Sequence, residues 1–179
     1  VNPLGTVPLM IDGTTRMTES AAICHYLASS RGPTPLNVEP GEADYGAYLN
    51  GLHFGEATLT FPQTLVLRYG RFEPPERRLA QAAEDYTRWF LSRLRTLEPR
   101  LETRDFLCAR RFTAADVSVG YALMLATDIG LHDRFKPATL AYWQRLQARP
   151  GFQRALTAQT QAARAQGVST ESVARWDGR

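Results

Sequence analysis

Two polar residues at the start of a predicted helix, together with a nearby proline, could bind a small carboxylate ligand. Glu19 and Ser20 open an amphipathic helical pattern that runs to about Leu27. The first turn of a helix offers unpaired N–H groups and the positive end of the helix dipole, and both favour a bound carboxylate. Val7-Pro8 provides an extended backbone that can pair with a peptide-like ligand as an added strand. These residue types, in this order, predict a site for a small peptide-like anion.

A β-hairpin is expected to position these groups. Val7 to Ile11 is a short apolar run, and Thr14 to Met17 is a β-rich return strand. Between them, Asp12-Gly13 is a dipeptide that suits a two-residue turn with positive φ at both positions. The helix follows at once, so the hairpin and the helix start are expected to be neighbours.

Each of these residues, taken singly, also has a simpler structural explanation. Thr18 or Ser20 could serve only as a helix cap. Glu19 in a first turn complements the helix dipole, and Pro8 could be a trans proline at the edge of a strand. The combination at this spacing favours a binding site over these separate explanations.

The combined order resembles the glutathione-binding half of the cytosolic glutathione transferases. The resemblance rests on Asn2-Pro3-x-Gly5-x-Val7-Pro8, the hairpin, and Glu19-Ser20-x-Ala22-Ile23-x-x-Tyr26-Leu27. It implies that Pro8 is cis, that the backbone of Val7 pairs with the cysteinyl part of glutathione, and that Glu19 and Ser20 hold the γ-glutamyl end. Thr6 stands where related sequences often have a lysine near the glycine carboxylate of glutathione, so it offers only a hydroxyl.

The resemblance also implies a reaction, the conjugation of the glutathione thiol, as co-substrate, to a small apolar electrophile. A free thiol has a pKa of about 8.5, and the thiolate is the nucleophile. In the family, a Tyr, Ser or Cys near the end of the first strand stabilises that thiolate. We expect this residue N-terminal to Val1, so the chain is expected to lack the first half of the thioredoxin-like domain, and we assign no catalytic residue within it.

The first helices of the second domain line the electrophile pocket in the family. The candidates here are Tyr48, Phe54, Phe61, Leu65, Arg68 and Tyr69. Each could instead pack in the core or contact a second copy of the chain. Two other functions stay open: a transferase-like domain that only binds ligands or partners, and a glutathione-dependent thiol-disulfide reductase. A catalytic cysteine would favour the reductase, but Cys24, inside a helix, is a poor substitute for one.

The fold class predicted for the whole chain is α+β and mostly α. Residues 1–30 are expected to form part of a thioredoxin-like domain, 31–41 a linker rich in proline and glycine, 42–165 an all-α domain of the transferase type, and 166–179 a tail. Apolar periodicity predicts helices over about 42–70 with an interruption at Pro62, over 75–101, from 113 onward, over 137–148 and over 150–165.

A folding motif is predicted where the helix that follows residue 112 begins. Thr113 suits the N-cap, Asp116 can bond back as in a capping box, and Phe112 and Val117 have the spacing of a hydrophobic staple. The segment resembles the capping box of the transferase helical domain, although Ala109 stands where a glycine is expected. We therefore treat this group as folding residues.

Composition narrows the function classes further. The 179 residues are 44% hydrophobic, enough for a buried core, and no stretch approaches the ~20 apolar residues of a membrane span. The net charge of +3 is spread over interleaved arginine and acidic residues, which does not favour nucleic-acid binding. Cys24 and Cys108 fit buried thiols of a reduced, cytoplasmic compartment, and the histidines show no metal-ligand spacing. The expected partners are glutathione, a small hydrophobic electrophile and a second copy of the chain.

Overall fold

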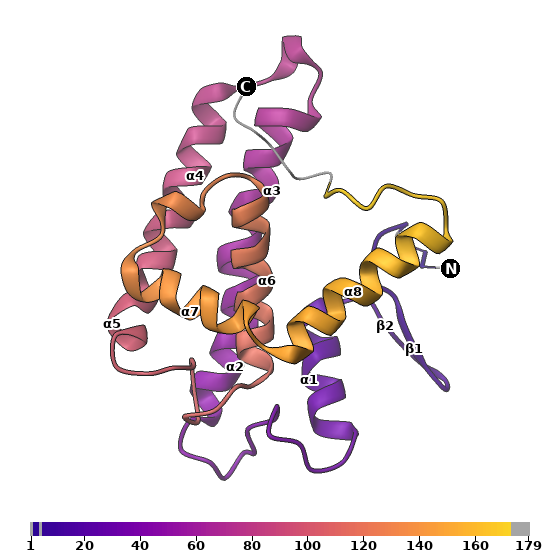
Figure 1. The fold of residues 1–179 in the computed structure, drawn as a ribbon, viewed down its shortest axis with the longest axis vertical. Helices are drawn as coiled ribbons and strands as arrows, with labels where there is room; N and C mark the ends of the chain where they lie inside the picture. Colours follow the sequence, from indigo (N-terminus) through magenta and orange to yellow (C-terminus); the bar gives the residue numbers. More distant parts are fainter. Residues whose placement is uncertain (1, 4, 173–179) are drawn as a thin grey trace.

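A computed structural model describes residues 2–3 and 5–172 and shows a hairpin that leads directly into a helix (Figure 1). Strands β1 (Met10–Asp12) and β2 (Thr15–Met17) pair antiparallel, and Asp12 lies opposite Thr15. The turn is therefore Gly13-Thr14, and of these two residues only Gly13 has a positive φ, 59°. The predicted turn at Asp12-Gly13 is wrong by one residue, because the glycine takes the first turn position, where the positive φ is needed.

Helices make up most of the described chain and follow the predicted segments closely. In chain order they are α1 (Ser20–Ser30), α2 (Tyr45–His53), η1 (Phe54–Thr60), α3 (Phe61–Leu67), η2 (Arg68–Phe72), η3 (Pro75–Arg77), α4 (Ala80–Leu94), η4 (Arg95–Leu97), α5 (Glu98–Leu101), α6 (Ala114–Asp128), η5 (His132–Arg134), α7 (Pro137–Gln147) and α8 (Pro150–Ala165). The predicted tail lies outside the described residues from 173 onward.

The predicted interruption at Pro62 takes the form of a change in helix type. The chain stays helical from α2 to η2, but η1 and η2 are wider π-helices on either side of α3. Pro62 lies in the first turn of α3, where its missing N–H is tolerated. Within η1, the hydroxyl of Thr60 donates to the carbonyl oxygen of Gly55 at 2.8 Å. Short π-helical segments of this kind are frequent at functional sites.

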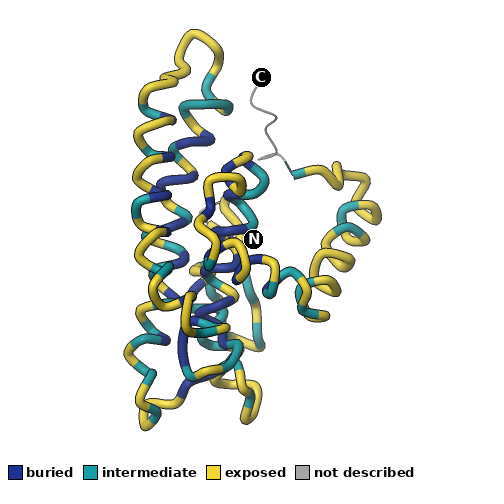
Figure 2. The backbone as a smooth tube through the Cα atoms, turned by 60° about the vertical axis from the view of Figure 1, so that its left-hand side comes forward, coloured by how far each residue is buried: buried dark blue, intermediate teal, exposed yellow. Residues whose placement is uncertain are grey.

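The hydrophobic core lies between the long helices. The segment from α2 to α3 runs beside α4 and α6, and α7 crosses near their lower end (Figure 1). Tyr48, Phe90, Leu123 and Tyr142 are fully buried at the centre of this bundle. Helix α8 leaves the bundle and projects to one side, with none of its residues buried (Figure 2). In the described part of the chain, no helix has the length and apolar character needed to span a membrane.

The segment between α1 and α2 is held against the bundle by Arg111. Its guanidinium donates to both carboxylate oxygens of Glu42, at 2.7 and 2.8 Å, and to the carbonyl oxygens of Pro35 and Asn37, at 3.0 and 2.8 Å. The hydrogen bonds from Arg111 are the main reason that the pKa of Glu42 is lowered to about 2. The segment is thus a fixed connection, and its role as a domain boundary stays a prediction.

The turn before α6 has a left-handed backbone at the position where the sequence lacks the expected glycine. Ala109 and Arg110 have φ values of 53° and 51°. A positive φ explains why glycine is favoured at residue 109, since glycine has no Cβ to clash with the backbone. The N–H of Ala109 donates to Asp44 Oδ2 at 2.7 Å, which fixes the turn against the start of α2.

The predicted capping box at the start of α6 is present and forms part of a larger buried network. Asp116 is fully buried and accepts four hydrogen bonds: from the N–H and the hydroxyl of Thr113 at 2.8 and 3.1 Å, the N–H of Leu107 at 3.0 Å, and the hydroxyl of Tyr142 at 2.8 Å. Burial nevertheless raises the pKa of Asp116, because desolvation outweighs these donors. Val117 is 41% exposed, and its staple contact with Phe112 stays a prediction.

Candidate functional site

One cavity of about 610 Å³ lies between the start of the chain, the first turn of α1, η1 and the second turn of α6. All five residues predicted to bind glutathione line it. Its lining residues are Thr6, Val7, Pro8, Thr18, Glu19, Ser20, Ala21, Cys24, Glu56, Thr60, Val117, Ser118 and Tyr121. The structure thus brings together the segment before the hairpin and the helix after it.

The segment before the hairpin presents free backbone to the cavity. The peptide bond between Val7 and Pro8 is cis, as the resemblance implies. The side chain of Val7 is 93% exposed, and no residue of the described chain pairs with its N–H or C=O. Asn2 is buried and donates to the carbonyl and hydroxyl oxygens of Thr6, at 2.7 and 3.1 Å. Asn2 therefore fixes this segment in place and leaves the hydroxyl hydrogen of Thr6 able to turn toward a ligand.

The first turn of α1 presents unbonded N–H groups on the other side. Glu19 is the N-cap residue, and no side chain caps the helix, so neither Thr18 nor Ser20 acts as the cap. Ile23 is the first residue of the helix whose N–H is bonded, to Glu19 O at 2.9 Å, and the three preceding N–H groups have no partner in the described chain. Such a helix end can bind a carboxylate through backbone N–H groups and the helix dipole.

The opposite wall comes from residues that the sequence did not identify as part of this site. Glu56 and Thr60 extend from η1, and Val117, Ser118 and Tyr121 extend from α6. Of these five residues, the sequence analysis named only Val117, and it assigned Val117 to folding rather than to ligand binding. The close approach of the two elements depends on glycines, because a Cβ at Gly55 would lie 2.4 Å from Ser118 Oγ and 2.5 Å from Ser118 C.

The spacing of Gly51 and Gly55 was the available signal for this contact. The two glycines are four residues apart, so they fall on one face of a helix. A Cβ at Gly51 would lie 2.9 Å from Ala115 Cβ, so α2 also approaches α6 closely. Local spacing does not show which part of the chain packs against that face. It also does not show that the packed segment contributes residues to the cavity.

The cavity lining contains two carboxylates, Glu19 and Glu56, and no cationic side chain. An anionic ligand would therefore rely on the N–H groups of α1 and on hydroxyl donors. Cys24 is the one thiol among the lining residues, and its pKa is raised by burial and, to a smaller extent, by Glu56. A raised pKa keeps the thiol protonated and makes it a poor nucleophile. Nowhere in residues 2–3 and 5–172 do three His, Cys, Asp or Glu side chains come together as a metal site.

The six predicted electrophile contacts do not line this cavity. Tyr48 is fully buried, its hydroxyl has no hydrogen-bond partner in the described chain, and burial raises its pKa to about 12. The prediction for Tyr48 is wrong, because a residue with no exposed surface belongs to the core. Phe61 is 53% exposed on α3, and Arg68 pairs with Glu73 at 3.0 Å. For Phe61 and Arg68, as for Phe54, Leu65 and Tyr69, the assignment stays a prediction.

A second cavity, of about 510 Å³, lies between α6 and α8 and shares Val117 and Tyr121 with the first. Its wall is mainly apolar and includes Phe112, Met124 and Phe152. The shared residues place apolar surface at the edge of the first cavity, where the part of a ligand beyond the carboxylate-binding end would lie.

Comparisons with known proteins agree with this arrangement. A family model described as "Glutathione S-transferase, N-terminal domain" matches residues 1–30. The chain is 27% identical over 168 residues to glutathione S-transferase 3 of Zea mays, which covers 88% of this chain and 73% of that protein. It is 28% identical over 160 residues to glutathione S-transferase GstA of Escherichia coli O157:H7, which covers 89% of this chain and 76% of that protein.

Solved structures show the same fold over most of the chain. A sphingomonad glutathione S-transferase complexed with glutathione aligns with a TM-score of 0.75 and 25% identity, over 88% of this chain and 75% of that one. Ure2p5 from Phanerochaete chrysosporium, cocrystallised with 1-(S-glutathionyl)-2,4-dinitrobenzene, aligns with a TM-score of 0.79 and 24% identity, over 91% and 79% of the two chains. The predicted fold class, a thioredoxin-like portion followed by an all-helical portion, is confirmed. In sequence and in fold, the chain is therefore similar to glutathione S-transferases.

Proposed function

We propose that this chain is a glutathione transferase that binds glutathione in the cavity at the start of α1 and conjugates its thiol to a small apolar electrophile. The observation that supports this most is the meeting of Thr6, Val7, Pro8, Glu19 and Ser20 around one cavity. The similarity to glutathione S-transferases supports glutathione transfer as the activity, and the apolar character of the electrophile is the further part of the proposal.

The unpaired groups around the cavity suit the two ends of glutathione. The free N–H and C=O of Val7 pair with the cysteinyl residue as a short added strand. The γ-glutamyl carboxylate lies at the free N–H groups of α1, and Glu19 accepts hydrogen bonds from the γ-glutamyl ammonium. The hydroxyl of Thr6 donates to the glycine carboxylate. No described residue is assigned to activation of the thiol.

The thiol-disulfide reductase is the weaker alternative for this cavity. Burial raises the pKa of Cys24 in its wall, and of Cys108 in the core, so neither thiol is prepared to act as the nucleophile of a reductase. Both cysteines are free, which fits the reducing conditions of a cytoplasmic location.

Replacement of Glu19 by glutamine is expected to weaken glutathione binding about 10-fold or more. The change removes a charge-assisted hydrogen bond to the ammonium group, which contributes roughly 1.5–3 kcal/mol. Isothermal titration calorimetry with glutathione measures the dissociation constant directly. Glu76→Gln is the matched control, because Glu76 is an exposed carboxylate on η3, away from the cavity. Equal binding by Glu19→Gln and the wild-type protein would show that the γ-glutamyl end binds elsewhere.

Replacement of Tyr121 by alanine is expected to raise the KM for 1-chloro-2,4-dinitrobenzene about 10-fold and to leave the KM for glutathione nearly unchanged. The ring supplies apolar surface beside the glutathione end of the cavity, and its loss removes roughly 1–2 kcal/mol of contact. Steady-state kinetics on Tyr121→Ala and Phe61→Ala compare the two assignments. A larger effect at Phe61 would favour the face predicted from the sequence. If the wild-type protein and both variants bind glutathione but none of them conjugates it, the chain is a binding domain.

A homodimer formed through the outer faces of α3 and α4 is the proposed assembly. Exposed apolar side chains lie on these helices and on the segment that joins them: Phe61 of α3 is 53%, Phe72 at the end of η2 57%, Leu79 just before α4 53% and Trp89 of α4 45% exposed. Trp89 also stacks on Tyr86, with ring centroids 5.6 Å apart. Trp89→Ala is expected to raise the dimer dissociation constant about 10-fold or more, as removal of an interface tryptophan commonly does. Analytical ultracentrifugation measures this, with Leu156→Ala on α8 as the control, and a wild-type protein that is monomeric throughout would contradict the proposal.

A further inference from the structure

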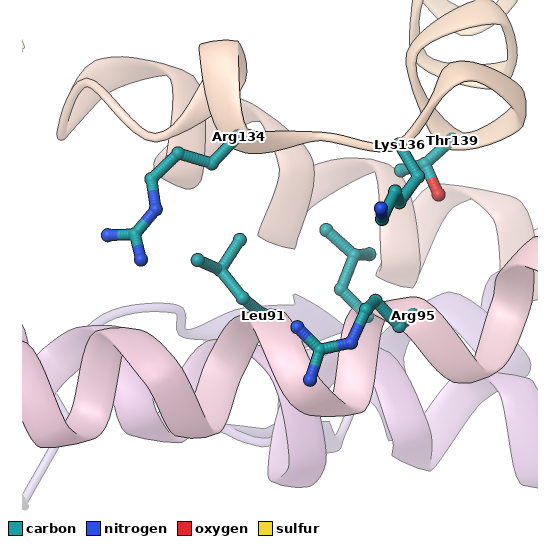
Figure 3. A pocket seen from close by; sticks show the side chains of 6 residues that line it. Leu91, Arg95, Arg134, Lys136 and Thr139 are labelled. Carbon is teal, nitrogen blue, oxygen red and sulfur yellow. The ribbon is translucent and has the colours of Figure 1, made fainter.

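A small cavity on the far side of the bundle is surrounded by cations that the proposed glutathione site does not use. It has a volume of about 170 Å³ and lies between α4 and the loop that joins η5 to α7. Its lining residues are Leu91, Leu94, Arg95, Arg134, Lys136 and Thr139. Figure 3 shows Arg134 and Lys136 on the loop side of the cavity, and Leu91 of α4 and Arg95, the residue that follows α4, on the other side.

The three cations have little carboxylate compensation. In the described chain, neither Arg95 nor Lys136 forms an ion pair. Arg134 lies 3.7 Å from Glu84 Oε1, an exposed carboxylate oxygen that is also 3.8 Å from Arg88. Three like charges around one small cavity repel one another, and a bound anion would relieve that repulsion.

The start of α7 is already occupied by a carboxylate, so it does not explain the cluster. Glu98 accepts hydrogen bonds from the N–H groups of Ala138 and Thr139, at 2.8 and 3.1 Å, and from the Thr139 hydroxyl at 2.7 Å. These bonds leave the Thr139 hydroxyl without a hydrogen for a ligand. A ligand in this cavity would therefore be held by the cationic side chains, because Glu98 already occupies the donors at the start of α7.

We propose that this cavity binds a phosphate group. Arginine presents a planar fork of N–H donors that matches phosphate oxygens, and lysine adds a compact positive charge. The cavity is large enough for one tetrahedral oxyanion, and the side chains of Leu91 and Leu94 form an apolar floor for carbon atoms next to it. The same chemistry serves inorganic phosphate and a phosphate monoester with an apolar body, and the apolar floor favours the monoester.

This site is separate from both surfaces assigned above. It shares no lining residue with the glutathione cavity. Leu94 and Arg95 follow Leu91 by three and four residues, so they share one face at the point where α4 continues into η4. Trp89, on the proposed dimer surface, is two residues from Leu91 and so lies on a different face of the helix. Phosphate binding can therefore succeed or fail independently of glutathione binding and of dimer formation.

Lys136 allows a direct test because it is the only lysine in the sequence. Reductive methylation with ¹³C-formaldehyde keeps its positive charge and places one NMR label in the cavity, and the labelled N-terminal amine serves as a reference. The protein is titrated with sodium phosphate and, separately, with phenyl phosphate, while sodium chloride holds the ionic strength constant. We expect a saturable shift of the Lys136 signal with both ligands and tighter binding of phenyl phosphate. Equal binding of the two would assign the site to the free ion.

Charge-removing variants separate a site from general attraction to a basic surface. Arg95→Gln and Arg134→Gln are each expected to raise the phosphate dissociation constant about 10-fold. Arg154→Gln, which removes an exposed arginine of α8, is the matched control and is expected to have an effect within about twofold. An equal loss in the Arg154 variant, or a Lys136 signal that does not saturate with either ligand, would overturn the proposal. Unchanged glutathione binding in the Arg95 variant shows that the fold is intact.

Discussion

Replacement of Asp116 by alanine is expected to lower the free energy of unfolding by about 3–5 kcal/mol. The carboxylate is fully buried and accepts four hydrogen bonds, from Leu107, Thr113 and Tyr142. Alanine leaves two backbone N–H groups and two hydroxyls without their acceptor in a place that water does not reach, and each unsatisfied donor costs roughly 1–3 kcal/mol. Urea denaturation followed by far-ultraviolet circular dichroism measures the loss.

Two further variants keep this prediction informative if Asp116→Ala does not fold. Asp116→Asn keeps one acceptor oxygen but turns a donor amide toward other donors, so it is also expected to destabilise the protein by more than about 1 kcal/mol. Asp133→Ala removes a carboxylate whose side chain is 84% exposed and should change stability by less than about 0.5 kcal/mol. A loss at Asp116→Asn no larger than at Asp133→Ala would contradict a structural role for the buried network.

Replacement of Gly55 by alanine is expected to destabilise the protein by about 1–3 kcal/mol and to weaken glutathione binding. The new Cβ would lie 2.5 Å from Ser118 C and 2.7 Å from Ser118 O. These are backbone atoms, so the clash cannot be relieved by a side-chain rotation, and η1 must move away from α6. Since these two elements form one wall of the cavity, the same movement separates Glu56 and Thr60 from Tyr121.

Gly46→Ala provides the control of opposite sign. Gly46 lies in α2, and a Cβ there would have no neighbour within 4 Å. Alanine is favoured over glycine in helices by roughly 0.5–1 kcal/mol, so this variant should be more stable than the wild-type protein. Thermal denaturation and glutathione titration of both variants measure the two effects. Similar stability and affinity in the two variants would show that Gly55 does not set the distance between η1 and α6.

The half of the candidate site that is formed by the first thirty residues was predictable from the sequence. Val7-Pro8, the hairpin and Glu19-Ser20 are joined by short connections, so local turn and helix rules bring them together. The capping box of Thr113 and Asp116 was predictable for the same reason, since its members are only three positions apart in the sequence. The hairpin turn was misplaced because the pairing of Asp12 with Thr15, which defines the turn, is a property of both strands.

The other half depends on long-range packing and could not be read from spacing. Glu56 and Tyr121 are far apart in sequence and come together only because glycines let η1 pack on α6. Tyr48 was misassigned because an aromatic residue at helical spacing fits a pocket and a core equally well, and only the packing of α1, α2 and α6 distinguishes the two. The two further hydrogen bonds that Asp116 accepts, from Leu107 and Tyr142, likewise come from other segments of the chain.

The start of α6 assigns different tasks to successive residues. A helix turns by about 100° per residue, so the buried Asp116 can bond to Leu107 and Tyr142 while Val117, which is 41% exposed, lines both cavities and Ser118 donates to the carbonyl oxygen of Leu52 at 2.6 Å. A designer or natural selection can therefore vary the side chain at 117 to accept ligands of other sizes without disturbing the anchor beside it. Neighbouring residues thus govern substrate range and folding stability, and each property can change without the other.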